Sequence, residues 1–101
     1  MDANTILIVE DDAGLIELLI EKVEGCGYQT FSVISASNAI DWLKKHSPFL
    51  MILDYSLPDL NGKELITELI ANGQVVPPFI VSTGQGDERI AVEMMKLGAK
   101  D

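Results

Sequence analysis

The sequence Leu50-Met51-Ile52-Leu53-Asp54 decides the fold, because four apolar residues run without interruption and end on one carboxylate. The segment that follows, residues 55–62, is rich in turn-forming residues and contains a proline, an asparagine and a glycine. A short apolar run between turn signals predicts a central strand buried on both faces, with Asp54 as the first residue beyond it. In an open α/β sheet, ligands bind at this carboxyl edge.

A second apolar run, residues 5–9 (TILIV), has the same design and ends on three acids. If the two strands are parallel neighbours, we expect the carboxylates of Glu10, Asp11, Asp12 and Asp54 to meet at one rim. Crowded like charges repel unless a cation lies among them, and ligand sets made only of oxygen suit Mg²⁺. For Asp12 we favour a different role, as the N-cap of the helix that follows.

Strand and helix patterns alternate along the whole chain. Strands are expected at residues 5–9, 28–33, 50–53 and 79–82, the second of them near an edge, and helices at 13–24, 37–46, 63–71 and 87–97. The first helix is expected to face the core with Leu15, Leu18, Leu19 and Val23. Repeated β–α units predict an α/β fold with a parallel sheet and helices on both faces.

The length and the composition of the chain limit the classes of function that are possible. The 101 residues allow one domain, and a hydrophobic fraction of 48% allows a real core. The apolar runs are far shorter than the roughly 20 residues of a membrane span. The net charge of −9 disfavours binding to nucleic acid or anionic lipid. The single cysteine, Cys26, cannot form an internal disulfide, which suits a reducing cytoplasm.

The sequence leaves few kinds of catalytic or binding site possible. No histidine follows a predicted strand, which argues against a Ser–His or Cys–His nucleophile pair. The sequence has no P-loop and no dinucleotide-binding fingerprint. The hydroxyl of Thr83 follows the fourth predicted strand and would lie near the acids. An aspartate nucleophile beside Mg²⁺ remains, because carboxylates attack phosphorus to form aspartyl-phosphates.

Four segments together resemble the receiver domain of two-component response regulators, a CheY-like family: ILIVEDD (residues 6–12), LDYSLPDLNG (53–62), STG (82–84) and LGAKD (97–101). Their order and spacing agree with the family along the chain. The resemblance implies a flavodoxin-like doubly wound sheet with strand order 2-1-3-4. It also implies a cytoplasmic signalling switch that catalyses only its own phosphorylation and dephosphorylation, and so is not an enzyme in the usual sense.

The resemblance assigns roles residue by residue. Asp54 matches the aspartate that takes a phosphoryl group from a sensor histidine kinase or a histidine phosphotransfer protein. Glu10 and Asp11 match the acid pair that holds Mg²⁺ together with Asp54, and Ser56 matches the position that offers its backbone carbonyl to the metal. Thr83 matches the switch hydroxyl that bonds to the phosphoryl group. A receiver also implies an effector domain, in the same or another chain.

The family continues into a fifth strand and a fifth helix, with an active-site lysine and a switch aromatic. All of these would lie beyond Asp101, so we expect residues 1–101 to be a receiver domain that is incomplete at its C-terminus. The strand at 79–82 would then expose an apolar edge, which predicts edge pairing or domain swapping between two copies.

Two other functions stay open. A phosphatase of the haloacid-dehalogenase type also uses an aspartate with Mg²⁺, but it needs a second aspartate two residues on as the general acid, and Ser56 stands there. A receiver-like adaptor would bind partners without phosphorylation. The acids and Thr83 argue against an adaptor, whereas the missing C-terminal elements argue for one.

Overall fold

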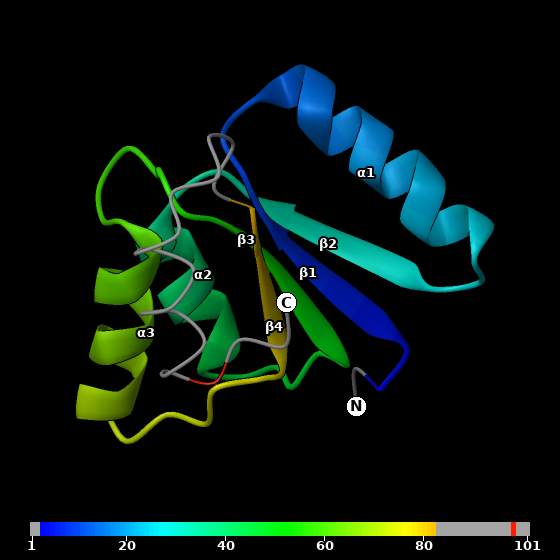
Figure 1. The fold of residues 1–101 in the computed structure, drawn as a ribbon. Coiled ribbons are helices and arrows are strands. Elements are labelled where there is room, and N and C mark those ends of the chain that lie inside the picture. The colour runs from blue at the N-terminus through cyan, green and yellow to red at the C-terminus, as the bar shows by residue number, and fades with distance from the viewer. Residues whose placement is uncertain (1–2, 83–97, 99–101) are drawn as a thin grey trace.

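The computed structural model describes residues 3–82 and residue 98, and within them it contains a four-stranded parallel sheet (Figure 1). The strands are β1 (Thr5–Val9), β2 (Gln29–Val33), β3 (Leu50–Asp54) and β4 (Phe79–Ser82). Their order is β2-β1-β3-β4, which confirms the predicted order and the edge position of the second strand. The helix predicted for 87–97 lies outside the described residues.

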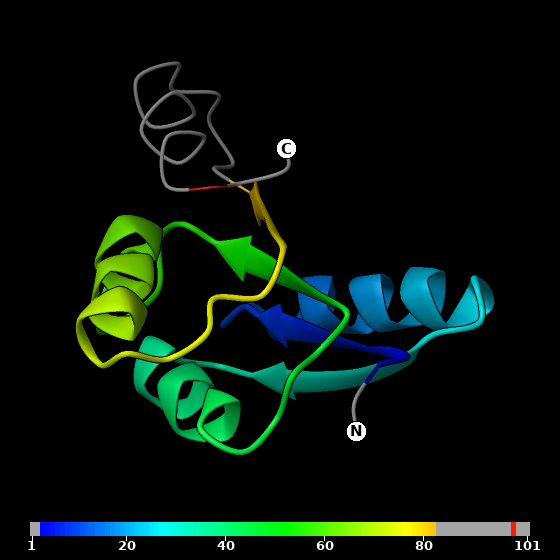
Figure 2. The ribbon, with the colours of Figure 1, turned by 90° about the horizontal axis from the view of Figure 1, so that it is seen from below.

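Three helices connect these strands: α1 (Ala13–Gly25), α2 (Ala36–Leu43) and α3 (Gly62–Ala71). Figure 2 shows α1 on one side of the sheet, with α2 and α3 next to each other on the opposite side. Helices on both faces of a parallel sheet are the doubly wound α/β fold that the sequence predicts. None of the helices in the described part of the chain is long and apolar enough to cross a membrane.

The main core lies between the sheet and the layer formed by α2 and α3. Side chains alternate between the two faces of a strand, and every second residue of the two central strands belongs to this core. Its fully buried members include Leu7, Val9, Met51 and Leu53 from the strands and Leu65, Ile66 and Leu69 from α3. On the α1 face, Ile6 and Ile8 are buried as well, so β1 is covered on both sides.

Asp54 is the last residue of β3, so its prediction as the first residue beyond the strand is wrong by one position. Asp54 lies opposite Ser82 of β4. The N–H of Tyr55 donates to the carbonyl oxygen of Ser82 at 3.0 Å, which carries the sheet pairing one residue further than the apolar run. The carboxylate still stands at the carboxyl edge of the sheet.

The second helix differs from the prediction of 37–46 at both ends. It begins at Ala36 and ends at Leu43. The N–H groups of Lys44 and Lys45 bond to carbonyls three residues back rather than four, which tightens the last turn and ends the helix. The boundaries of the other elements among residues 3–82 agree with the prediction to within one residue.

Leu18 was expected to face the core from α1, and this is wrong. Its side chain is 47% exposed, whereas Leu15, Leu19 and Val23 are half-buried as expected. At about 100° per residue, Leu18 lies well outside the stripe that those three residues form with Ile16. The buried face of α1 is therefore narrower than the apolar content of its sequence indicates.

Gly62, the first residue of α3, packs tightly against Tyr55, so a side chain there would force its neighbours to shift. A Cβ there would lie 3.1 Å from Cδ1 and 3.4 Å from Cα of Tyr55. Gly62→Ala is expected to lower the free energy of unfolding by about 1–3 kcal/mol, measured by urea unfolding. Gly25→Ala is the matched control, because a Cβ at Gly25 meets nothing within 4 Å. Equal effects of the two substitutions would contradict the close packing at Gly62.

Candidate functional site

Three carboxylates meet at the carboxyl edge of the sheet. Glu10 and Asp11 directly follow β1, and Asp54 ends β3. The two strands are parallel neighbours, with Val9 opposite Leu53. One oxygen from each of the three acids lies within 4.8 Å of the other two. The structure therefore brings together three of the four acids that the sequence places at this rim.

Asp12, the fourth acid, caps α1 instead. Its Oδ1 accepts the N–H of Leu15 at 3.2 Å. The N-cap predicted for Asp12 is confirmed. The expectation that four carboxylates meet is therefore wrong. Three of them meet, because the carboxylate of Asp12 accepts a hydrogen bond from the N-terminus of α1 instead.

Glu10 is the buried member of the cluster, with only 5% of its surface exposed. Its Oε2 accepts the N–H groups of Asp11 and Asp12, both at 3.2 Å, and its own N–H donates to the carbonyl oxygen of Val33 at 3.1 Å. Burial raises the pKa of the Glu10 carboxyl, and repulsion by Asp54 and Asp11 adds to this rise, whereas the hydrogen bond from Asp12 opposes it.

The raised pKa of Glu10 is expected to make stability depend on pH when no divalent cation is present. The folded chain binds this proton more tightly than the unfolded chain does. The stabilisation is therefore complete below the ordinary pKa of 4.5 and is lost as the pH rises through the raised pKa. Glu10→Gln keeps the size and an oxygen acceptor but cannot titrate.

We therefore expect the free energy of unfolding of the wild type to fall relative to that of Glu10→Gln as the pH rises. Urea unfolding in EDTA over a pH series would measure this difference, and the comparison cancels the titration of the other carboxylates. A difference that stays constant with pH would contradict the raised pKa of Glu10.

Asp54 opens a loop, residues 55–62, that is closed at its base. The N–H of Gly62 donates to the carbonyl oxygen of Tyr55 at 2.8 Å, and Ser56 and Asn61 form an antiparallel bridge. Asn61 caps α3 in a capping box with Glu64. This closure follows from the local Asn-Gly sequence, which stops the loop and starts the helix.

Ser56 lies in this loop beside the acid cluster. Its N–H donates to Oδ1 of Asp54 at 3.2 Å, which orients that carboxylate. The role of the Ser56 carbonyl as a metal ligand stays a prediction. Thr83, the expected switch hydroxyl, lies outside the described residues, although its neighbour Ser82 is opposite Asp54.

Asp59 also lies in this loop, and the sequence does not predict its role. Its two carboxylate oxygens accept the N–H groups of Ala36 and Ser37 at the start of α2, each at 2.9 Å. These hydrogen bonds hold the pKa of Asp59 below its usual value. The contact spans more than 20 residues, so no local sequence signal could have revealed it.

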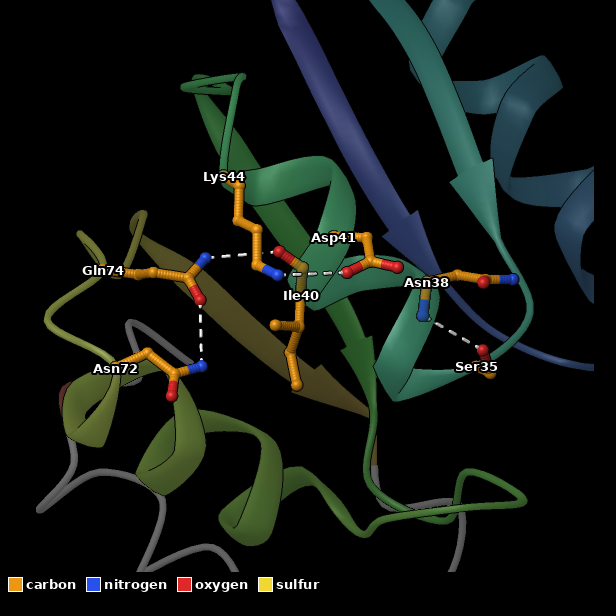
Figure 3. A network of polar contacts seen from close by, with 7 residues as sticks. All are labelled: Ser35, Asn38, Ile40, Asp41, Lys44, Asn72 and Gln74. Carbon is orange, nitrogen blue, oxygen red and sulfur yellow. Dashed lines mark hydrogen bonds and ion pairs between the residues drawn. The ribbon is translucent and has the colours of Figure 1, made fainter.

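A groove lies at the opposite end of the sheet. Its volume is about 540 Å³, and it is lined by residues 43–48 and 73–78, which precede β3 and β4. Figure 3 shows Gln74 reaching across to α2, where its Nε2 donates to the carbonyl oxygen of Ile40 at 3.2 Å. An ion pair between Lys44 and Asp41 lies next to this contact. The acid cluster lies at the other end of the sheet and is not part of this groove.

The cluster offers hard oxygen donors, and no histidine or cysteine of the described part of the chain joins it. Hard oxygen donors fit Mg²⁺, which is bound by one or two carboxylates with water and phosphate oxygens. A cation among the three carboxylates would offset the repulsion of Glu10 by Asp54 and Asp11. A carboxylate beside such a cation can also act as a nucleophile toward phosphorus.

Comparisons with known proteins agree on one protein family. The sequence model of the response regulator receiver domain matches residues 6–101. The chain is 31% identical over 102 aligned positions to the phosphate regulon transcriptional regulatory protein PhoB of Pseudomonas aeruginosa, covering 100% of this chain and 44% of that protein. It is 33% identical over 94 positions to sporulation initiation phosphotransferase F of Bacillus subtilis, covering 93% of this chain and 75% of that protein.

Solved structures agree over nearly the whole chain. A response regulator receiver protein from Pseudomonas putida superposes with a TM-score of 0.87 at 28% identity, covering 100% of this chain and 84% of the other. The signal receiver domain of a histidine kinase from Syntrophus aciditrophicus gives a TM-score of 0.81 at 34% identity, covering 98% and 76%. The chain spans less than half the length of the PhoB relative, so the match is to one part of that longer protein.

Proposed function

The chain belongs to the response regulator receiver domain family, and we propose that it acts as a phospho-accepting switch in a two-component phosphorelay. In this proposal Asp54 takes a phosphoryl group from a sensor histidine kinase or a histidine phosphotransfer protein. The observation that carries the proposal is the meeting of Glu10, Asp11 and Asp54 at the ends of two neighbouring strands. An effector domain, in the same or another chain, would respond to the change.

Residues of this chain would bind the cation and position the carboxylate of Asp54. Glu10, Asp11, Asp54 and the backbone carbonyl of Ser56 would hold Mg²⁺, which when bound would neutralise charge on the incoming phosphoryl group. The buried Glu10 is fixed by its hydrogen bonds to the backbone, so it gives the site a rigid base. Asp11 and Asp54 are more exposed than Glu10, so the phosphoryl donor would approach the cluster from their side.

The transfer step would form one bond and break one. A carboxylate oxygen of Asp54 would attack phosphorus in line, while the bond from phosphorus to the donor nitrogen or oxygen breaks and its electron pair leaves with the donor. The N–H of Ser56 would hold the carboxylate in position through the bond to Oδ1. The hydroxyl of Thr83 would then bond to an oxygen of the transferred group.

The product would change the charge of an already acidic rim. A phosphorylated side chain carries about −1.5 to −2 charge near pH 7. Next to Glu10 and Asp11 this added charge would favour a rearrangement of the surrounding loops over the resting arrangement. Such a rearrangement is what an effector would read.

Intact mass spectrometry tests the proposal. Incubation with acetyl phosphate and Mg²⁺ is expected to add about 80 Da, the mass of one phosphoryl group, and no mass is expected to be added in EDTA. An adaptor would gain no mass, and a phosphatase would hydrolyse the donor continuously without keeping the group. The absence of any mass gain in the folded wild type with Mg²⁺ present would contradict the proposed function.

A further inference from the structure

The N-terminus of α2 is capped by two side chains, and one of them comes from a distant loop. The first N–H groups of a helix have no partner inside the helix. The Oγ of Ser35 accepts the N–H of Asn38, at 3.2 Å. The N–H groups of Ala36 and Ser37 depend on Asp59. The start of α2 is thus completed by a residue of the loop that follows Asp54.

Asp59 is the outer anchor of a loop whose base is already fixed. The Ser56–Asn61 bridge closes the loop below it. The N–H of Ser56 bonds to the carboxylate of Asp54, so the position of the loop affects that carboxylate directly. Leu57 and Leu60 pack against the core from this loop, and Asp59 adds the polar contacts of the loop with the start of α2.

The same connection also fixes the other half of the acid cluster. The N–H of Glu10 bonds to the carbonyl oxygen of Val33, the last residue of β2. Only Ile34 and Ser35 separate Val33 from the start of α2, where Asp59 binds. Glu10 on one side and the Asp54 loop on the other are therefore tied to one short segment between β2 and α2.

We propose that Asp59 is a positioning residue for the site of Glu10, Asp11 and Asp54, acting through the loop that carries Ser56. This inference rests on the proposed function, because it concerns how that site takes up its cation. A carboxylate suits this role because its two oxygens accept two hydrogen bonds and its charge interacts favourably with the helix N-terminus. An asparagine would offer only one oxygen.

Calorimetric titration with MgCl₂ tests the role of Asp59. Asp59→Ala is expected to raise the Mg²⁺ dissociation constant by about tenfold, the low end for residues that support metal ligands. Asp59→Asn keeps one acceptor and a residue that can cap a helix, so it is expected to give a smaller rise. Glu68→Ala removes an exposed carboxylate from α3 and controls for the change in net charge; its dissociation constant is expected to match that of the wild type.

A second readout separates positioning from a loss of stability. At a temperature where every variant is folded, the Mg²⁺ concentration for half-maximal phosphorylation by acetyl phosphate is expected to rise in Asp59→Ala by the same factor as the dissociation constant. A variant that is only less stable would keep the wild-type Mg²⁺ dependence once folded. If Asp59→Ala does not fold, Asp59→Asn supplies the comparison.

The outcomes distinguish this inference from the function on which it rests. A wild type that is phosphorylated, with an unchanged dissociation constant in the Asp59 variants, would overturn the role of Asp59 alone. An equal rise in Glu68→Ala would also overturn it, because the effect would then be one of net charge. A wild type that binds no Mg²⁺ would overturn both proposals.

Discussion

Asp54→Asn is expected to take up no phosphoryl group from acetyl phosphate in the presence of Mg²⁺, whereas the wild type gains about 80 Da. The amide has the shape of the carboxylate, but its oxygen is a much weaker nucleophile and its charge is gone. The fold is expected to persist, because Asn can make the strand pairing with Ser82 and can accept the N–H of Ser56. Intact mass spectrometry measures the effect, and circular dichroism confirms folding.

Asp12→Asn is the matched control for this loss. It makes the same chemical change two residues from Glu10, but Asp12 caps α1 and stands outside the three-carboxylate cluster. Asn caps a helix about as well as Asp, so near wild-type uptake is expected. Persistent uptake in Asp54→Asn would show that the acceptor lies elsewhere. Loss of uptake in Asp12→Asn would contradict the separation of the cap from the site.

Leu69→Ala is expected to lower the free energy of unfolding by about 3 kcal/mol. The Leu69 side chain is fully buried between α3 and the sheet, and its removal leaves a cavity in the main core. A total stability of about 5–15 kcal/mol is usual for a domain, so this loss is a large share of it. Urea unfolding followed by circular dichroism measures the change.

Ile70→Ala, at the next position of the same helix, is the control. The Ile70 side chain is 56% exposed, and its removal is expected to change the free energy of unfolding by no more than about 0.5 kcal/mol. Equal losses at positions 69 and 70 would contradict the orientation of α3 on the sheet. A small loss at both positions would mean that the α3 layer adds little to the core.

The fold could be predicted because its strands are short apolar runs and its turns carry strong local signals. Residues 5–9 and 79–82 match β1 and β4 at both ends. The meeting of Glu10 with Asp54 could also be predicted, because the carboxyl ends of neighbouring parallel strands share one edge. These inferences need only local pattern and the general geometry of parallel sheets.

The errors arose where a distant contact decides the outcome. Asp54 belongs to β3 because of its partner Ser82, which an isolated segment cannot reveal. Leu18 is exposed because only a narrow face of α1 meets the sheet. Asp59 stands in a segment of turn-forming residues, and its role cannot be predicted locally because the two N–H groups that it accepts belong to a helix more than 20 residues earlier.

The groove of residues 43–48 and 73–78 lies at the amino end of the sheet, opposite the acid cluster. The described hydrogen bonds of the acid cluster are made by the ends of β1, β2 and β3 and by the loops that follow β1 and β3, whereas residues 43–48 and 73–78 lead into β3 and β4. Val75, in the second of these segments, is 82% exposed. A peptide tag or a fluorescent label is therefore best inserted beside Val75, where the strand pairing from Phe79 onward keeps the edge with the acid cluster in place.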